Sequence, residues 1–357
     1  MPVLGMAASF YYGVPISSRR LLPVLSDRRI SSMEHKQALL DLLSDGRFHS
    51  GEQLGDTLGI GRSAVWKHLR ALAQKGIEIH AVRGKGYRLD GQLELLSREK
   101  IFSLLPLSAR RHISGLEIHP AIASTNRFLL DKLAHDHSSA YVCLAESQWE
   151  GRGRRGRFWV SPYASNLYLS LSWRFLEMPA AFTALGLAVG VALVRALAIL
   201  GLQGVRLKWP NDVFWGAGKL AGILLEMSGE SGGSCNVVIG IGLNIRMPAQ
   251  AAGQIGQPWC DLEQALGRSV SRNQVCALVL QQLLDVLCQF QQQGFAPFIE
   301  EWRRHDATYG KEVTIVVSGR HFSGTAVGID NNGACLLRYQ DQLHRFMAGD
   351  VTLRRAP

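Results

Sequence analysis

GRGRRGRFW, at residues 151–159, decides which fold the middle of this chain can adopt. Gly151, Gly153 and Gly156 match the GxGxxG pattern of dinucleotide-binding folds, but that fingerprint requires a helix to begin at the glycines. The residues that follow, over 158–173, are typical of a strand instead. The chain also lacks the GxxxxGK motif of a P-loop. We therefore interpret the segment as a glycine–arginine loop whose guanidinium groups close on phosphate or carboxylate oxygens.

The sequence around this loop predicts a mixed α/β domain. Strand-like runs flank the loop, and further strands and helices follow it. The strands are expected over 142–148, 166–173, 205–209, 219–227 and 236–245, and helices over 180–200 and 271–304. The apolar run 180–200 contains Arg195 and is rich in alanine and glycine, so we expect a buried helix rather than a membrane span.

A helix-turn-helix is predicted in front of this domain by FHSGEQLGDTLGIGRSAVWKHL (48–69). Its helices are expected over 35–46, 51–59 and 62–76. Ser50 and Gln53 have the spacing of a capping box at the start of the middle helix. The segment IEIHAVRGKGYRL (77–89) then predicts two strands around a basic turn, which is the wing of a winged helix.

The second helix of such a motif reads DNA by lying in the major groove with its first residues toward the base edges. Arginine and lysine there contact phosphates or guanine, and basic residues of the wing add phosphate contacts. The residues predicted to bind DNA are Ser50, Gly51, Arg62, Ser63, Trp66, Lys67, Arg70, Arg83 and Lys85, with Arg88 beside them on the wing. A winged helix used only for protein contacts is the alternative.

Alternating strands are predicted to end the chain as a small β-barrel. They are expected over 312–319, 321–330, 334–340 and 343–353. The predicted domains are therefore a winged helix-turn-helix over 33–96, the mixed α/β domain over 97–304 and the barrel over 305–357. Residues 1–32 are expected to be an extension that is either disordered or an overlong gene start.

The composition suits a basic protein of two or three domains. The 357 residues carry a formal charge of +10 and a pI near 9.5, which favours a polyanionic partner. The six cysteines are scattered, without a CxxC or a histidine at ligand spacing. This pattern excludes a disulfide framework and a zinc site, and it favours a reducing compartment such as the cytoplasm.

Four short motifs surround the loop in sequence, and each alone is weak. STN (124–126) offers two hydroxyls and an amide to a polar ligand. KWPND (208–212) places a lysine and an aspartate around a proline turn, and KLAGIL (219–224) begins with a lysine. GIGLN (240–244) ends a strand with glycines that permit a close approach.

Together, STN, AESQWEGRGRRGRFW, KWPND, GKLAGIL and GIGLNI strongly resemble the biotin–protein ligase family in order and spacing. FHSGEQLGDTLGIGRSAVWKHL and GKGYRL resemble its bifunctional bacterial members, the biotin operon repressors. The resemblance runs from the first predicted helix to the C-terminus. It implies a multidomain α+β fold, with an N-terminal winged helix-turn-helix, a central ligase domain of the class II synthetase-like type and a C-terminal SH3-like β-barrel.

The resemblance also implies a two-step reaction that uses ATP and Mg²⁺. Biotin's carboxylate attacks the α-phosphorus of ATP to give biotinyl-5′-AMP and pyrophosphate. A lysine of the biotin carboxyl carrier protein then attacks the acyl carbon, and AMP leaves. No dedicated metal site is expected, because magnesium accompanies the phosphates. The adenylate is expected to serve as corepressor, so that a homodimer carrying it binds operator DNA.

Residue roles follow from the motif match. The implied catalytic set is Lys219, Arg154, Lys208 and Asp212, with Lys219 expected to stabilise charge at the reacting carboxyl and α-phosphate. The implied biotin-binding set is Ser124, Thr125, Asn126, Gln148, Arg152, Gly153, Arg154, Lys219, Gly240 and Gly242. The implied adenylate- or ATP-binding set is Gly151, Arg155, Gly156, Arg157, Trp159, Asn211 and Asn244. Asp212 is a candidate base for the acceptor lysine, a partner that orients Lys208, or a magnesium ligand, and these alternatives stay open.

Two other functions fit parts of the sequence. A pure winged-helix regulator would bind an effector in an inactive ligase-like domain, but Arg152, Arg154 and Lys219 argue against it. A lipoate ligase shares the acyl-adenylate chemistry, but the glycine–arginine loop and the attached winged helix favour biotin.

Overall fold

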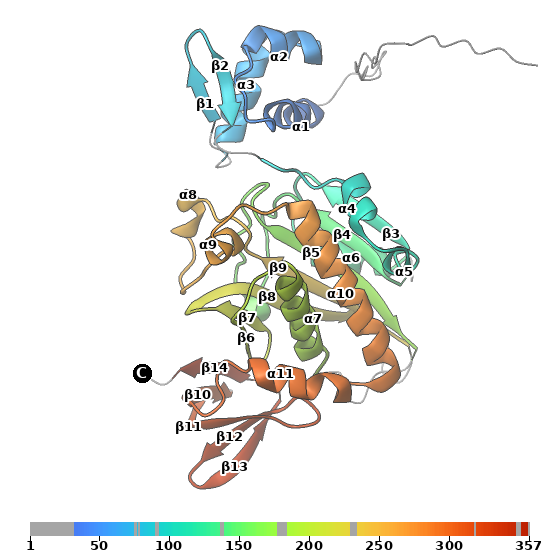
Figure 1. The fold of residues 1–357 in the computed structure, drawn as a ribbon, viewed down its shortest axis with the longest axis vertical. Helices are drawn as coiled ribbons and strands as arrows, with labels where there is room; N and C mark the ends of the chain where they lie inside the picture. Colours follow the sequence, from blue (N-terminus) through green and yellow to red (C-terminus); the bar gives the residue numbers. More distant parts are fainter. Residues whose placement is uncertain are drawn as a thin grey trace, which may run out of the picture.

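The computed structural model places the winged helix at one end of the long axis, the large α/β domain in the middle and a small β-domain at the other end (Figure 1). It describes residues 32–74, 77, 79–89, 93–135, 139–176, 184–228, 234–317, 319–347 and 351–355. The predicted extension over 1–32 lies outside these residues except for its last one. None of the helices in the described part of the chain combines the length and the hydropathy of a membrane span.

The winged helix forms as the sequence predicts. Its elements are α1 (Ser32–Leu43), α2 (Gly51–Leu58), α3 (Arg62–Ala73) and the antiparallel pair β1 (Ile79–Val82) and β2 (Gly86–Leu89). The capping box is confirmed, since Ser50 Oγ accepts from Gln53 N at 3.0 Å and Gln53 Oε1 accepts from Ser50 N at 3.1 Å. Gly59 ends α2 with a φ of +65°, which makes the tight turn before α3 possible.

Within the described residues, seven strands form the central sheet in the order β3-β4-β5-β9-β8-β7-β6. They are β3 (Gly115–His119), β4 (Tyr141–Ala145), β5 (Leu167–Phe175), β6 (Val205–Lys208), β7 (Asp212–Trp215), β8 (Gly218–Ser228) and β9 (Cys235–Leu243). β3 and β4 are parallel, and the other neighbouring pairs are antiparallel. The five predicted strands are confirmed, whereas β3 and β7 are too short to show a clear alternation.

Helices cover both faces of this sheet. α7 (Leu185–Ile199) and α10 (Arg272–Gln293) pack against each other and against one face (Figure 1). α7 is buried on almost every side, as its apolar sequence predicts. α6 (Thr125–Leu133) lies on the other face, where its leucines pack on Cys143 and Val238. The strand neighbours of these two residues belong to the α7–α10 side, because side chains alternate along a strand.

The helical stretch predicted over 271–304 is divided in two. α10 ends before Gly294, whose φ of +65° is outside the helical region, and a 3₁₀ turn at Ala296–Phe298 leads into α11 (Ile299–His305). The remaining short helices are α4 (Arg98–Leu104), α5 (Leu107–Arg110), α8 (Ala249–Ala252) and α9 (Leu262–Leu266).

The C-terminal domain is an antiparallel sheet, and one of its predicted strands is wrong. Its strands are β10 (Glu312–Val317), β11 (Arg320–Ile329), β12 (Cys335–Tyr339), β13 (Gln342–Phe346) and β14 (Val351–Arg355), in the order β13-β12-β11-β10-β14. The run 343–353 therefore forms two strands, because one continuous strand cannot reach both edges of the sheet. Among the described residues the two edges do not pair with each other, so closure into an SH3-like barrel stays a prediction.

Candidate active site and DNA-binding face

A cavity of about 470 Å³ opens on the side of the sheet that carries α6. Its walls come from the start of α6, the glycine–arginine loop, the β6–β7 turn, and strands β8 and β9. The predicted site residues that line it are Ser124, Thr125, Asn126, Gln148, Arg152, Gly153, Arg154, Arg155, Arg157, Trp159, Lys208, Asn211, Asp212, Lys219, Gly240, Gly242 and Asn244. Gly151 and Gly156 are not among the residues that line it.

A bulge in β8 turns Lys219 toward this cavity. Lys219 pairs with Phe214, but Ala221 pairs with Val213, so Leu220 is an extra residue in the ladder. Because side chains alternate along a regular strand, Lys219 would otherwise share the core face with Ala221. Because of the bulge, Lys219 lines the cavity instead, while Leu220 is fully buried in the core.

Positive charge gathers at this end of the cavity. The Nζ atom of Lys219 lies 2.7 Å from Asp212 Oδ1 and 5.5 Å from the centroid of the Trp159 ring. Arg154 Nη1 donates to Asn211 Oδ1 at 3.5 Å. Burial, reinforced by neighbouring arginines, lowers the pKa of Arg154 from its ordinary value. Two preorganised cations suit a ligand on which negative charge develops, and Asp212 orients Lys219, a partner that the sequence did not indicate.

The glycine–arginine loop is a tight turn held by its own backbone. Trp159 N donates to Gly151 O at 2.9 Å, and Gly153 N donates to Arg157 O at 2.7 Å. A Cβ atom on Gly151 would lie 2.4 Å from Trp159 O, and Gly156 has a φ of +71°. The two glycines that do not line the cavity therefore shape the loop.

Hydroxyl and amide groups meet at the other end of the cavity. Ser124 caps α6, and its Oγ accepts from Arg127 N. Thr125 N donates to Gln148 Oε1 at 2.9 Å. Asn126 is 4% exposed, and its Nδ2 donates to Glu226 Oε2 at 2.8 Å. This end can recognise a small polar group by hydrogen bonds of fixed direction.

Gly240 and Gly242 let side chains lie directly on β9. A Cβ atom on Gly240 would lie 2.3 Å from Asn126 Oδ1, and one on Gly242 would lie 2.4 Å from the Trp159 ring. The Nε1 atom of Trp159 is buried and has no hydrogen-bond partner within the described residues. A ligand acceptor at this point would satisfy it.

The structure adds site residues that no motif indicated. The segment after β9 contributes Met247, Gln254, Ile255, Gly256, Gln257 and Trp259 to the cavity lining. It is held there because Lys219 N donates to Pro258 O at 3.1 Å. Glu226 contacts Asn126 and Arg152 without lining the cavity. Strand alternation could have found Glu226, since it follows Gly222 and Leu224 at a period of two on β8.

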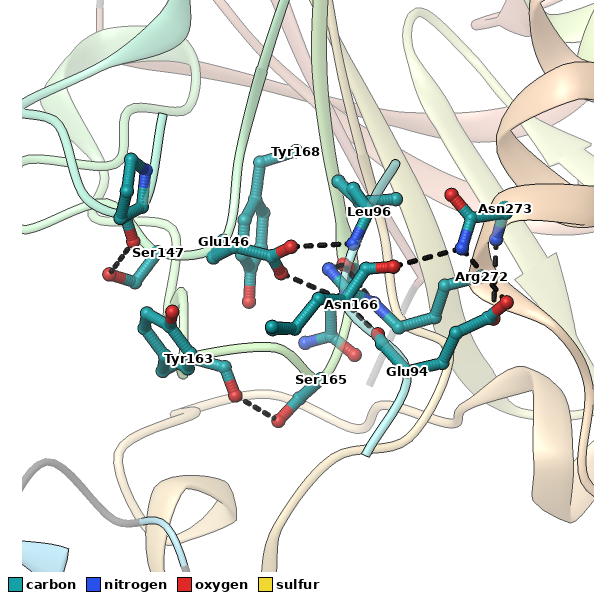
Figure 2. A network of polar contacts seen from close by, with 12 residues as sticks. Glu94, Leu96, Glu146, Ser147, Tyr163, Ser165, Asn166, Tyr168, Arg272 and Asn273 are labelled. Atoms are coloured by element: carbon teal, nitrogen blue, oxygen red, sulfur yellow. Dashed lines mark hydrogen bonds and ion pairs between the residues drawn. The ribbon is translucent and has the colours of Figure 1, made fainter. Parts of the chain in front are cut away.

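A buried ion pair holds the strand ends near the cavity (Figure 2). Glu146 and Arg272 are 2% and 4% exposed, and Arg272 Nη1 lies 2.7 Å from Glu146 Oε2. Arg272 also donates to Asn166 O at 2.8 Å and to Glu94 O at 2.7 Å. The other carboxylate oxygen of Glu146 accepts from Leu96 N at 2.6 Å. The network joins the end of β4 and the start of α10 to the segment that leads from the winged helix.

Helix α3 presents a basic outer face. Its apolar residues Val65, Leu69 and Leu72 are buried. The predicted DNA contacts Arg62, Ser63, Trp66, Lys67 and Arg70 are exposed on α3, and Arg83 and Lys85 are exposed on the wing. Ser50 caps α2 and Gly51 is buried at its start, so these two residues shape the beginning of α2. Their contact with DNA stays a prediction. Among the described residues, no group of three or more His, Cys, Asp and Glu side chains could hold a metal ion.

Comparisons with known proteins cover all three parts of the chain. Family models match as the biotin/lipoate A/B protein ligase family over residues 118–244, an HTH domain over 35–88, and the biotin protein ligase C terminal domain over 308–354.

Two curated relatives match this chain over nearly their whole length, and a solved structure matches about two thirds of it. The bifunctional ligase/repressor BirA of Escherichia coli (strain K12) is 39% identical over 318 residues, which are 89% of this chain and 97% of that protein. BirA of Bacillus subtilis (strain 168) is 31% identical over 330 residues, 89% of this chain and 98% of that protein. The solved biotin protein ligase from Aquifex aeolicus in complex with biotin and ATP matches with a TM-score of 0.59 and 26% identity, covering 68% of this chain and 100% of that one.

Proposed function

This chain belongs to the biotin protein ligase family, in the branch with a helix-turn-helix domain. On this premise we propose which residues act in each step of the reaction and which bind DNA. The protein is an ATP-dependent biotin protein ligase and a DNA-binding repressor. The observation that carries these assignments is that one cavity is lined both by cations, among them Lys219 and Arg154, and by the directional polar groups of Thr125, Asn126 and Gln148.

The first step joins biotin to the α-phosphate. A carboxylate oxygen of biotin attacks the α-phosphorus of ATP, and the bond to pyrophosphate breaks. Lys219 lies at the reacting end and is placed to neutralise charge that develops on the phosphoryl oxygens. Arg154 extends this positive surface from the loop. Thr125, Asn126 and Gln148 hold the head of biotin at the polar end, where Arg152 pairs with Glu226.

The second step transfers the acyl group. The amine of an acceptor lysine on the biotin carboxyl carrier protein attacks the acyl carbon of biotinyl-5′-AMP, and AMP leaves with the bonding electrons. The amine must lose a proton, and Asp212 is the carboxylate nearest to Lys219 at the reacting end. Among the described residues that line the cavity, Asp212 is also the only acidic one. Its pairing with Lys219 fits a magnesium ion carried by the ATP phosphates rather than by a protein cage.

Repression uses the same ligand through a second surface. The outer face of α3 and the wing bind the operator, and biotinyl-5′-AMP is the corepressor that favours a DNA-binding homodimer. The basic residues exposed on α3 support this role, since they match the charge of the DNA backbone. A cytoplasmic location for both activities stays a prediction of the sequence.

Transfer of labelled biotin to a carrier domain tests the ligase roles. Wild-type protein with Mg-ATP should label the carrier, and Lys219→Ala should reduce kcat by roughly a hundredfold or more, because it removes a charge that acts in the transition state. Lys100→Ala, an exposed lysine on α4, is the matched control and should retain activity. Lys219→Ala with wild-type kcat would refute the catalytic assignment, and no transfer by folded wild-type protein would refute the ligase function.

A further inference from the structure

We propose that Glu226 is a positioning residue of the biotin site, which sets the direction of the hydrogen bonds that meet the ligand. The inference rests on the biotin-binding roles proposed above for Thr125 and Asn126. Glu226 lies near the end of β8 with 25% of its side chain exposed. It contacts two predicted site residues, Asn126 and Arg152, from just outside the cavity.

Glu226 fixes which end of the Asn126 amide faces β8. A carboxylate can only accept hydrogen bonds, so the amide must turn its NH₂ group toward Glu226. The Nδ2 atom of Asn126 lies 2.8 Å from Glu226 Oε2 and 3.4 Å from Leu224 O, which is a second acceptor. The carbonyl oxygen Oδ1 therefore points the other way, toward Ser170 on β5. Because Asn126 is 4% exposed, water does not compete for either end.

Through Ser170, the orientation of the Asn126 amide determines the direction in which the Thr125 hydroxyl donates. The Ser170 hydroxyl lies 2.5 Å from Asn126 Oδ1 and 2.7 Å from Thr125 Oγ1, and it has one hydrogen to donate. Asn126 Oδ1 can only accept, so the Ser170 hydrogen goes there. The Thr125 hydroxyl then donates its own hydrogen inward, to Gln148 Oε1 at 3.2 Å.

The result is an acceptor that faces the cavity. With its hydrogen directed into the protein, Thr125 Oγ1 presents lone pairs to a ligand. The ureido N–H groups of biotin need such an acceptor. If the Asn126 amide were reversed, its NH₂ group would donate to the Ser170 oxygen. The Ser170 hydroxyl would then donate its hydrogen to Thr125 Oγ1, which would use the lone pair that a ligand needs. The carboxylate of Glu226 thus selects the arrangement that leaves Thr125 open to an N–H donor.

A second contact of Glu226 must be separated from the first. Arg152 Nη2 lies 3.4 Å from both carboxylate oxygens, and its side chain is 39% exposed. An ion pair this exposed contributes little. The buried hydrogen bond to Asn126 is therefore the contact through which Glu226 acts on the site. Glutamine has the same shape without the charge, so Glu226→Gln separates the two contacts.

Three variants of the full-length protein test the proposal by calorimetric titration with biotin and by steady-state kinetics. Glu226→Ala should raise the Kd for biotin about tenfold, since it leaves a buried amide without its acceptor. The KM for ATP and kcat should stay within about twofold, because the reacting end is untouched. Glu226→Gln should keep most of the affinity, since its amide oxygen can accept from Asn126 although it cannot pair with the charge of Arg152. Glu150→Ala removes an exposed carboxylate that pairs with Arg127 at 3.5 Å, and it should bind biotin like the wild type.

A variant of Ser170 keeps the test decisive if Glu226→Ala does not fold. Ser170→Ala breaks the path from Asn126 to Thr125 and should by itself weaken biotin binding. Where Glu226→Ala does fold, adding it to Ser170→Ala should cause no further loss. Unchanged biotin affinity in Glu226→Ala or Ser170→Ala overturns the proposal, as does a Glu226→Gln protein that binds as weakly as Glu226→Ala. Failure of the wild-type protein to transfer biotin would refute the ligase function instead.

Discussion

Trp66 is 51% exposed on the outer face of α3, among the basic residues of that face. The Arg70 guanidinium lies 5.2 Å from its ring centroid, one helical turn away. In a major groove, an apolar side chain at this position can contact the methyl group of thymine. We predict that replacing thymine by uracil in a selected operator weakens wild-type binding roughly fivefold, which is about 1 kcal/mol.

Gel-shift titrations with matched thymine and uracil duplexes check this prediction. Trp66→Ala should bind both duplexes equally, because it no longer reads the methyl group. Lys67→Ala is the control, since loss of a phosphate contact should weaken binding to both duplexes by the same factor. A Trp66→Ala protein that still distinguishes thymine from uracil would show that another residue reads the methyl group.

At the level of single residues, the sequence predicted most of the cavity lining but little of its geometry. The motifs gave Lys219 and Asp212 separately, yet their 2.7 Å ion pair depends on the bulge at Leu220. A bulge is set by pairing with the neighbouring strand, so no local pattern in the sequence reveals it. Strand alternation places Glu226 on the cavity side of β8, but its contact with Asn126, a hundred residues away in the chain, is visible only in the structure.

Asp306, at the end of α11, gives a prediction at the level of elements. Burial raises the pKa of Asp306 above its ordinary value, although hydrogen bonds from Thr308 N and Oγ1 at 2.8 Å oppose the shift. The folded protein therefore holds this proton to a higher pH than the unfolded chain does. The fold loses stability as pH rises from the unfolded pKa through the folded pKa, and the full cost of ionised Asp306 is present above the folded pKa. Below the unfolded pKa of about 4 this cost disappears.

Asp306→Asn should thus make the protein more stable at pH 8, because a neutral side chain avoids the cost of burying a charge there. The asparagine oxygen can still accept from Thr308, so the turn should be retained. Urea unfolding at pH values from 4 to 8 measures the difference, which should shrink toward the acidic end. A variant that is less stable than the wild type at pH 8 would mean that the carboxylate contributes more through its hydrogen bonds than it costs through burial.

Elements with a strong local signal in the sequence were predicted, and those that depend on tertiary pairing were not. α7 was evident from its apolar sequence, and α2 from its capping box. The alternation of the run 343–353 predicts one strand, because it does not show that β13 pairs with β12 while β14 pairs with β10. The break after α10 could have been placed from Gly294 and Pro297, which punctuate the helical pattern.

At the scale of the whole molecule, the winged helix is packed onto the ligase domain. Its hydrophobic cluster includes Leu93 from the connecting segment, and Tyr163 and Ala164 from the ligase domain. The latter two follow the glycine–arginine loop directly in the sequence. Next to them the connecting segment enters the network of Glu146 and Arg272 (Figure 2). The sequence predicted a boundary between residues 96 and 97, but not these long-range hydrogen bonds.

Glu94 is the residue whose side chain holds this connection at the start of α10. Its Oε1 accepts from Ser271 Oγ at 2.9 Å and from Asn273 Nδ2 at 2.8 Å. Glu94→Ala removes an acceptor from both donors, although Asn273 Nδ2 keeps its hydrogen bond to Leu95 O at 2.9 Å, and we expect a cost of about 1 kcal/mol. Because the Glu146–Arg272 pair remains, we expect the domains to stay folded while the connection opens about ten times more often.

Limited trypsin digestion measures this opening, since cleavage follows the open population when closing is faster than cutting. Cleavage at Arg98 and Lys100 should accelerate in Glu94→Ala but not in Glu99→Ala, which removes an exposed carboxylate bonded to Ser97 Oγ at 2.9 Å. Equal cleavage rates in the two variants would mean that the apolar contacts of Leu93, rather than the Glu94 carboxylate, hold the winged helix in place.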